Sequence, residues 1–111
     1  MGWQNDGQFA GLYGYGPYQY YGWIIGNMNE QATGHIYMYG HCTSGYAGHL
    51  YVYVSSDAYN WNLVSTPYVS QTSPYWIDCG TYQGTFNYIA VTVEHPYEFV
   101  YIGLDSVRVE S

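Results

Sequence analysis

The sequence predicts an all-β domain of eight antiparallel strands, and three observations support this expectation. Runs in which apolar and polar residues alternate recur along the 111 residues, with the period of a half-buried strand. Clusters of Gly, Pro, Asn, Asp and Ser separate these runs at roughly even spacing. No helical spacing of apolar residues and no fixed-period repeat is visible in the sequence. The pattern therefore favours one β-sandwich or β-barrel domain over residues 1–111.

The clearest strand and turn lie in the middle of the chain. In the run HLYVYVS (49–55), leucine and valine alternate with tyrosine. Asp57 and Asn60 follow, and their short side chains bond readily to the local backbone, so the chain can reverse there. Trp61 restarts the apolar pattern. We expect a strand, a tight turn and the beginning of a second strand.

The other strands are expected at residues 8–13, 22–27, 33–42, 59–69, 75–79, 86–94 and 99–109. The run 59–69 should break near Pro67, because proline has no backbone donor for the ladder. Strands that alternate up and down place the connections 14–21, 42–48, 70–74 and 95–97 at one end of the domain. The same alternation places 28–32, 56–58 and 80–85 at the other end.

Composition limits the classes of partner. The chain has a net charge of −7, with Arg108 as its one basic residue and no lysine. Such a chain repels nucleic-acid phosphates and anionic membrane surfaces. No apolar run reaches membrane-spanning length, and no signal region follows Met1. The sequence therefore fits a mature chain or an excised module, and its many uncharged polar residues favour an extracellular or cell-surface location.

Four segments carry a family resemblance: HLYVYVSSDAYNWNLVS, YWIDCG, FNYIAVTV and IGLDSVRV. They resemble the galactose-binding-like jelly rolls of many carbohydrate-binding modules and discoidin-type domains. The likeness covers the chain from residue 49 onward and rests on hydrophobic spacing and on the Ser-Asp-x-x-Asn-Trp turn; DGQFAGLYG and GWIIG fit the opening strands more loosely. It implies an eight-stranded antiparallel jelly-roll β-sandwich. It implies a ligand less specifically, because such folds host many functions.

The expected ligand-binding surface is the rim formed by the connections at the first end. Tyrosine has an apolar face and a polar edge, which suits the C–H faces and hydroxyls of a sugar ring. The rim residues are Tyr15, Tyr18, Tyr20, His41, Tyr46, His49, His95 and Tyr97. A second interpretation stays open, in which the loop tyrosines only cover the ends of the core, because tyrosine occurs throughout this chain.

A second tyrosine set alternates with core positions along the strands. It consists of Tyr37, Tyr39, Tyr51, Tyr53 and Tyr88. A direct hairpin of strands 33–42 and 49–55 would pair Tyr39 with Tyr51, whereas the jelly roll implied by the resemblance places these strands in opposite sheets. Uncharged aromatic faces, and edges without lysine, favour association. This set is the expected assembly face of an alternative function, a self-assembling structural subunit of an extracellular filament or surface layer.

The resemblance also raises a calcium site, since related modules often carry a structural calcium near the start of the chain and the last strand. Asp6, Glu30 and Asp105 are its candidate oxygen ligands. Their spacing matches no EF-hand loop. The alternative is that they are isolated, solvated carboxylates at turns.

Cys42 and Cys79 both fall on core-facing strand positions. The alternation of connections places them toward opposite ends, beyond the roughly 7 Å between Cα atoms that a disulfide spans. We therefore expect two buried thiols, although an extracellular setting favours a bridge.

Catalytic motifs are missing from the sequence. There is no Gly-x-Ser-x-Gly, no His-Glu-x-x-His and no phosphate-binding glycine loop. His35 and His41 share a strand face but lie about 20 Å apart, too far to hold one metal. Glycoside hydrolysis by two of the carboxylates Asp57, Asp78, Glu94 and Glu98 remains a weaker alternative. We expect a non-catalytic extracellular carbohydrate-binding or adhesive module, with glycan or further copies of the chain as its partner.

Overall fold

The computed structural model describes the backbone of residues 10–15, 19–20, 22–57, 59–94 and 99–110, and the side chains of residues 33–57, 59–93 and 100–110. The strands are β1 (Ala10–Tyr15), β2 (Gln19–Tyr20), β3 (Gly22–Cys42), β4 (Gly48–Ser55), β5 (Asn62–Ser65), β6 (Tyr68–Val69), β7 (Tyr75–Glu94) and β8 (Phe99–Glu110). Over these residues the chain is all-β and its strand pairs are antiparallel, so this part of the prediction is confirmed. No helix in the described part of the chain has the length and hydropathy needed to cross a membrane.

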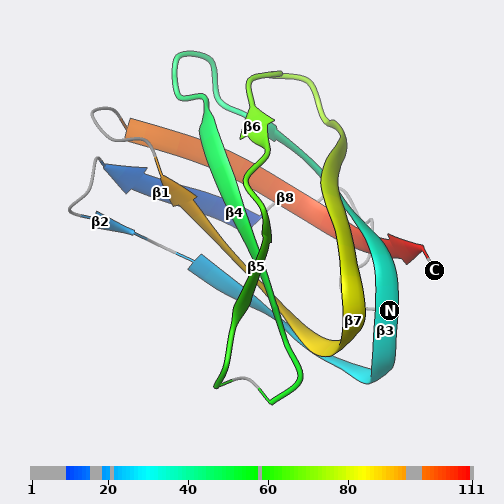
Figure 1. Ribbon diagram of the computed structural model, residues 1–111. Coiled ribbons are helices and arrows are strands. Elements are labelled where there is room, and N and C mark those ends of the chain that lie inside the picture. Colours follow the sequence, from blue (N-terminus) through cyan, green and yellow to red (C-terminus); the bar gives the residue numbers. More distant parts are fainter. Residues whose placement is uncertain (1–9, 16–18, 21, 58, 95–98, 111) are drawn as a thin grey trace.

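The strands form one hydrogen-bonded path in the order β2-β1-β8-β3-β7-β4-β5, and β6 pairs with β4. β3 and β7 are the longest strands and occupy the middle of this path. Both bend sharply near their midpoints in Figure 1, and β4 and β5 lie in front of β1 and β8 in that view. The bend divides the β3–β7 pair into two parts that have different neighbours.

The register of the strands shows these two parts. Residues 22–27 of β3 pair with 88–92 of β7, and the same end of β7 also pairs with β4. Residues 34–40 of β3 pair with 75–82 of β7, and this end of β3 also pairs with β8. Between the two parts the register shifts repeatedly, and Gly34 has a φ of 128°. Bulges and a glycine in a left-handed conformation let a continuous strand turn without ending.

Two expected connections are therefore wrong. Residues 28–32 belong to β3 and residues 80–85 belong to β7. The polar residues and glycines of these segments suit a bulged, strongly bent strand as well as they suit a turn. The expected connection 14–21 also contains the short strand β2, which pairs with β1.

Other boundaries follow the sequence more closely. β5 ends at Ser65 and β6 begins at Tyr68, so the expected break near Pro67 is confirmed. The expected start of this strand at residue 59 is wrong, since β5 begins at Asn62. The direct hairpin between β3 and β4 is wrong, since β7 lies between them in the strand order. The expected start of the first strand and the turn 95–97 lie outside the described residues.

The core is one cluster to which both parts of the bent hairpin contribute. The alternation that builds this core is clearest in β4, where every second residue from Gly48 to Val54 is buried and the tyrosines point away from the core. The buried hydrophobic residues are Ile36, Met38, Cys42, Leu50, Val52, Val54, Val69, Ile77, Cys79, Phe86, Ile89, Val91, Val93, Val100, Ile102, Leu104 and Val107. Burial of the apolar set on alternate positions is what holds the strands in this register.

Both cysteines are buried and free, as expected. Cys42 pairs with Ile102 of β8, whereas Cys79 lies two residues beyond Ile77, the partner of Met38. Cys79 is thus level with about residue 36 of β3, six residues from Cys42, which is a separation of about 20 Å along the strand. Burial raises the pKa of the Cys79 thiol to about 12, so this thiol is a core residue rather than a nucleophile.

Candidate binding faces

The first candidate face, here called the open face, consists of Tyr53, Trp61, Leu63, Ala90 and Thr92. Tyr53 of β4 pairs directly with Leu63 of β5 and with Ala90 of β7, so the three side chains share one side of the sheet. A shallow pocket of about 290 Å³ opens between Tyr53, Trp61, Ala90 and Thr92. Leu63 beside it is 53% exposed. The open face is therefore hollowed, aromatic and uncharged.

The pocket exists because a small residue separates larger ones. Ala90 lies on β7 between the buried Ile89 and Val91, so it points to the outer side of the sheet. Its methyl group leaves space beside the ring of Tyr53, and Trp61, which follows the turn after β4, also lines that space. Thr92 adds a hydroxyl group at the next outward position on β7.

Trp61 follows a turn whose backbone is held by the carboxylate of Asp57. Asp57 Oδ1 accepts hydrogen bonds from the backbone N–H groups of Tyr59 and Asn60, each at 2.9 Å, and from Ser55 Oγ at 3.0 Å. Asp57 Oδ2 accepts one from Asn60 Nδ2 at 2.8 Å. The bonds from the Asn60 and Tyr59 backbone hold the pKa of the Asp57 carboxyl well below its ordinary value, because they stabilise its charged form.

The second candidate face, here called the closed face, consists of His35, Tyr37, Tyr39, Trp76, Asp78 and Arg108. Its strands are β3, β7 and β8, and the direct pairs are Tyr37 with both Asp78 and Arg108, and Tyr39 with Trp76. The rings of Tyr39 and Trp76 lie 5.2 Å apart. The closed face is as aromatic as the open face, but it also carries the one cation of the chain.

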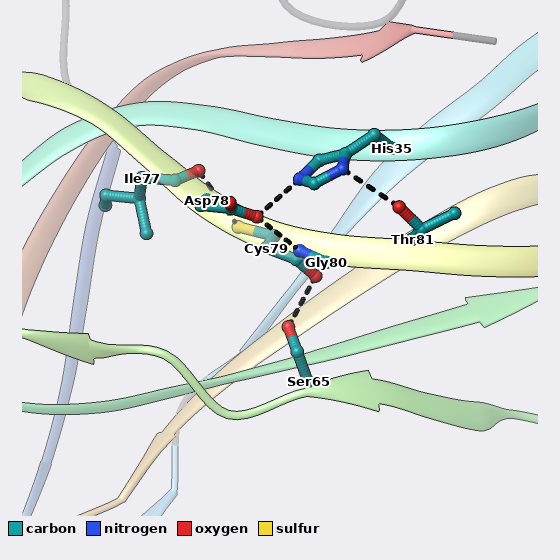
Figure 2. Close-up of polar contacts among 7 residues, drawn as sticks. All are labelled: His35, Ser65, Ile77, Asp78, Cys79, Gly80 and Thr81. Carbon is teal, nitrogen blue, oxygen red and sulfur yellow. Dashed lines mark hydrogen bonds and ion pairs between the residues drawn. The ribbon is translucent and has the colours of Figure 1, made fainter.

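Polar contacts tie the closed face together. Figure 2 shows His35 between Asp78 and Thr81: its Nε2 contacts Asp78 Oδ1, and its Nδ1 lies 2.9 Å from Thr81 Oγ1. The Gly80 N–H also donates to Asp78 Oδ1, at 2.9 Å. This N–H and then His35 lower the pKa of the Asp78 carboxyl. The His35 ring in turn stacks on Tyr37 with centroids 4.3 Å apart.

Arg108 covers the aromatic surface of the closed face. Its guanidinium carbon lies 4.7 Å from the centroid of Tyr37 and 4.6 Å from that of Trp76. Its Nε is 3.2 Å from Glu110 Oε1. The rings of Tyr37 and Trp76 are therefore occupied by a cation–π partner from the same chain. A ligand that stacks there must first displace the guanidinium.

The order Thr81, His35, Asp78 has the connectivity of a nucleophile, a base and an orienting carboxylate. The Asp78 side chain is 67% exposed, so water competes for each of these contacts. The contacts join β3 to β7, two strands far apart in sequence, on the closed face.

The rim expected from the sequence is only partly described. Tyr46 is exposed at 43% in the β3–β4 connection, which docks on β8 through a hydrogen bond from the Tyr101 N–H to the Tyr46 carbonyl. His41 Nδ1 contacts the Cys42 carbonyl, whereas His49 Nδ1 contacts the carbonyl of Thr66 and its ring lies edge-on to Tyr68. The two histidine rings are thus held by different segments. Tyr15 and Tyr20 lie on β1 and β2, while Tyr18, His95 and Tyr97 lie outside the described residues.

The five tyrosines of the expected assembly face divide between the two faces. Tyr37 and Tyr39 belong to the closed face. Tyr51, Tyr53 and Tyr88 lie on the β4–β7 part, where Tyr51 pairs with Thr92 and Tyr88 with Ser55. All five are half-buried. They therefore lie on two surfaces.

The expected calcium site stays a prediction. Asp105 on β8 is only 3% exposed. The Glu30 side chain and the whole of Asp6 lie outside the described residues. Within the described side chains, no group of three or more His, Cys, Asp or Glu residues is placed to hold a metal.

Sequence reasoning missed the residues that distinguish the two faces: Trp61, Ala90 and Thr92 on one, Trp76 and Arg108 on the other. A signal was present for Trp76, because it alternates with the core positions Ile77 and Cys79 in the run YWIDC. Ala90 alternates with Ile89 and Val91 in the same way. What the alternation does not contain is the register between strands, which sets these residues beside their partners.

Comparison with known proteins adds no assignment. No family model, curated protein or solved structure matches this chain. The jelly-roll resemblance therefore remains a prediction.

Proposed function

We propose that this chain is a non-catalytic carbohydrate-binding or adhesive module whose open face binds an uncharged glycan. The observation that carries the proposal is the shallow pocket of about 290 Å³ between Tyr53, Trp61, Ala90 and Thr92. Ligand sites in proteins are concave, mostly apolar and supplied with a few polar groups. This pocket has that character and lies at the small end of the usual size range.

The lining residues favour a neutral sugar over other ligands. Tyr53 and Trp61 provide flat apolar surface with polar edges, which matches the alternation of C–H and hydroxyl groups on a pyranose ring. Thr92 adds a hydroxyl that can donate or accept. None of the lining side chains that the structure describes is charged, and a net charge of −7 disfavours an acidic glycan.

A non-catalytic role is supported by the two carboxylates that the structure describes most fully. The pKa values of Asp57 and Asp78 are both lowered by hydrogen bonds to the charged forms. A glycosidase acid needs the opposite shift, since it must hold a proton near neutral pH. The uncharged, aromatic composition supports a place outside the cell or on its surface.

We also propose that the strands form a jelly-roll sandwich, and the pairing order supports it. One layer would contain β1, β8, the second part of β3 and the first part of β7. The other would contain the first part of β3, the second part of β7, β4 and β5. Buried residues of both groups join in one core cluster, as the facing layers of a sandwich do.

Isothermal titration calorimetry with uncharged oligosaccharides tests the glycan proposal. Cellohexaose, mannohexaose and a galacto-oligosaccharide are suitable probes, and an oligogalacturonate is the acidic comparison. We expect binding of at least one uncharged probe and its loss in Ala90→Leu, which fills the pocket. Thr81→Val, on the closed face, is the matched control and should bind normally. If no uncharged oligosaccharide binds, or if the acidic one binds more tightly, the proposal is overturned.

A second candidate function is self-assembly into a filament or surface layer. It is favoured by Leu63, which is 53% exposed on β5, the strand that ends the hydrogen-bonded path. Lysine, a common protection of edge strands, is absent from the chain. Light scattering and negative-stain microscopy over a concentration series test it, with Leu63→Lys as the variant expected to reduce association. A chain that stays monomeric at every concentration would exclude self-assembly. A calcium chelator added to the same series tests the proposed calcium site of Asp6, Glu30 and Asp105.

A further inference from the structure

We infer that Asp57 is the positioning residue of the open face: its carboxylate holds the turn that presents Trp61 to the ligand. The inference rests on the proposed function, because it assigns to Asp57 a role in the affinity of the same pocket. Asp57 itself is exposed and is not among the residues that line the pocket. Its effect on a ligand would act through Trp61.

The sheet alone does little to fix Trp61. β5 begins one residue later, at Asn62, and its ladder with β4 consists of the pairs Val54 with Asn62, Tyr53 with Leu63, and Val52 with Ser65, with a register shift among them. Among the described strands β5 ends the order, so within them it has a ladder on one side. A short edge strand frays readily, which leaves a residue at its start dependent on the preceding turn.

The Asp57 carboxylate supplies the missing constraint. It binds the backbone N–H groups of Tyr59 and Asn60, the two residues that immediately precede Trp61. It also binds the Asn60 side chain and, at the other end of the turn, Ser55 Oγ on β4. One side chain thus connects the end of β4 to the residue before Trp61.

This connection affects affinity because a pocket wall that is already ordered loses little conformational entropy when a ligand binds. Immobilising a large side chain on binding costs about 0.5–1.5 kcal/mol, which is up to about tenfold in affinity. Trp61 provides one of the two aromatic rings among the described residues that line the pocket. We therefore expect loss of the Asp57 carboxylate to weaken glycan binding by about tenfold while the fold is retained.

Three variants separate positioning from direct contact. Asp57→Ala removes all of the carboxylate bonds and should weaken calorimetric binding of the best uncharged oligosaccharide by about tenfold. Asp57→Asn keeps an oxygen in the Oδ1 position, which accepts the bonds from Tyr59 and Asn60 N–H, and should restore most of the affinity. Tyr59→Ala removes a ring that is 88% exposed on the same turn but keeps the backbone N–H, so it should bind like the native chain.

The outcomes distinguish this inference from the function on which it rests. Loss of binding in Trp61→Ala together with full affinity in Asp57→Ala would preserve the glycan site and overturn the positioning role. Equal losses in Tyr59→Ala and Asp57→Ala would assign the effect to contact by the tip of the turn and also overturn it.

A measurement without ligand tests the same role. Amide hydrogen exchange of Asn60 and the ¹⁹F resonance of fluorotryptophan at position 61 report the order of the turn. In Asp57→Ala we expect faster exchange and a shifted, averaged resonance, both reversed in Asp57→Asn. An unchanged resonance in Asp57→Ala would overturn the positioning role whatever the ligand proves to be.

Discussion

The closed face and the open face are built from the same kinds of residue, but they differ in what lies against their aromatic rings. Each has outward tyrosines alternating with a buried apolar row and a tryptophan nearby. On the closed face, Arg108 lies over Tyr37 and Trp76, and His35 stacks on Tyr37 while it contacts Asp78. On the open face, the small side chain of Ala90 leaves a pocket beside Tyr53 and Trp61.

The difference teaches that aromatic content does not by itself identify a binding surface. A ring contributes to binding when its face is accessible before the ligand arrives. The single cation of the chain is used to cover rings on one face, which leaves the other face uncharged.

The largest expected effect concerns the strands beneath the closed face. In Gly40→Ala the new Cβ would overlap the carbonyl oxygen of Gly103 on the neighbouring strand β8. Backbone cannot rotate away, so we expect a loss of about 3 kcal/mol in the free energy of unfolding. In Gly48→Ala the new Cβ would meet Val100 Cγ2 at 2.6 Å and Cγ1 at 2.8 Å. These are methyl groups of a buried side chain rather than backbone atoms, so the loss should be smaller than in Gly40→Ala. Urea unfolding measures both, and equal losses would contradict this account.

Next in size is the loss of the tryptophan from each face. Trp61→Ala removes an aromatic wall of the pocket and should weaken binding of an uncharged oligosaccharide by about a hundredfold, as for a central binding residue. Trp76→Ala should leave that affinity unchanged, because Trp76 lies on β7 opposite Tyr39, away from the pocket lining. Calorimetry on the two variants checks the comparison. The reverse result would exchange the roles of the two faces.

A smaller effect is expected when the cover of the closed face is removed. Arg108→Ala abolishes the contacts of the guanidinium with Tyr37 and Trp76 and should lower the free energy of unfolding by about 1 kcal/mol. The uncovered rings should also increase self-association, measured by light scattering. Glu110→Gln is the control, since it removes the ion pair and leaves the guanidinium over the rings. A monomeric Arg108→Ala variant of native stability would show that the cover is not needed.

The smallest effect concerns the pH dependence of the closed face. The pKa of Asp78 is lowered by the Gly80 N–H and by His35, so its charged form stabilises the native state. This contribution is present above the unfolded pKa of about 3.9 and is lost as the pH falls through the native pKa. Asp78→Asn should therefore be less stable than the native chain near pH 7, by under about 1 kcal/mol at this exposed site. The difference in stability between the native chain and Asp78→Asn should disappear in strong acid, and thermal unfolding over a pH series measures it. A difference that stays constant with pH would show that the substitution acts through side-chain shape rather than charge.

Much of the fold could be predicted before the structure. The alternation in HLYVYVS indicates which residues of β4 are buried, and Pro67 indicates the break between β5 and β6. The continuous β3 and β7 could not be predicted, because glycine and polar residues mark a bulged bend as readily as a turn. The candidate site was predictable only as a kind of surface, uncharged and aromatic, without its residues.

The sequence by itself determined the class of the molecule: an antiparallel all-β chain with outward tyrosines, an Asp57 turn before Trp61, and one cation against a net charge of −7. Only the tertiary structure decided which tyrosines are covered. His35 meets Asp78 across 43 residues, and Arg108 reaches Tyr37 from another strand. Local alternation sets the side of the sheet that a residue faces, while the register between distant strands sets its neighbours. The side that a residue faces can be predicted from the sequence, whereas its neighbours on other strands depend on how the whole core packs.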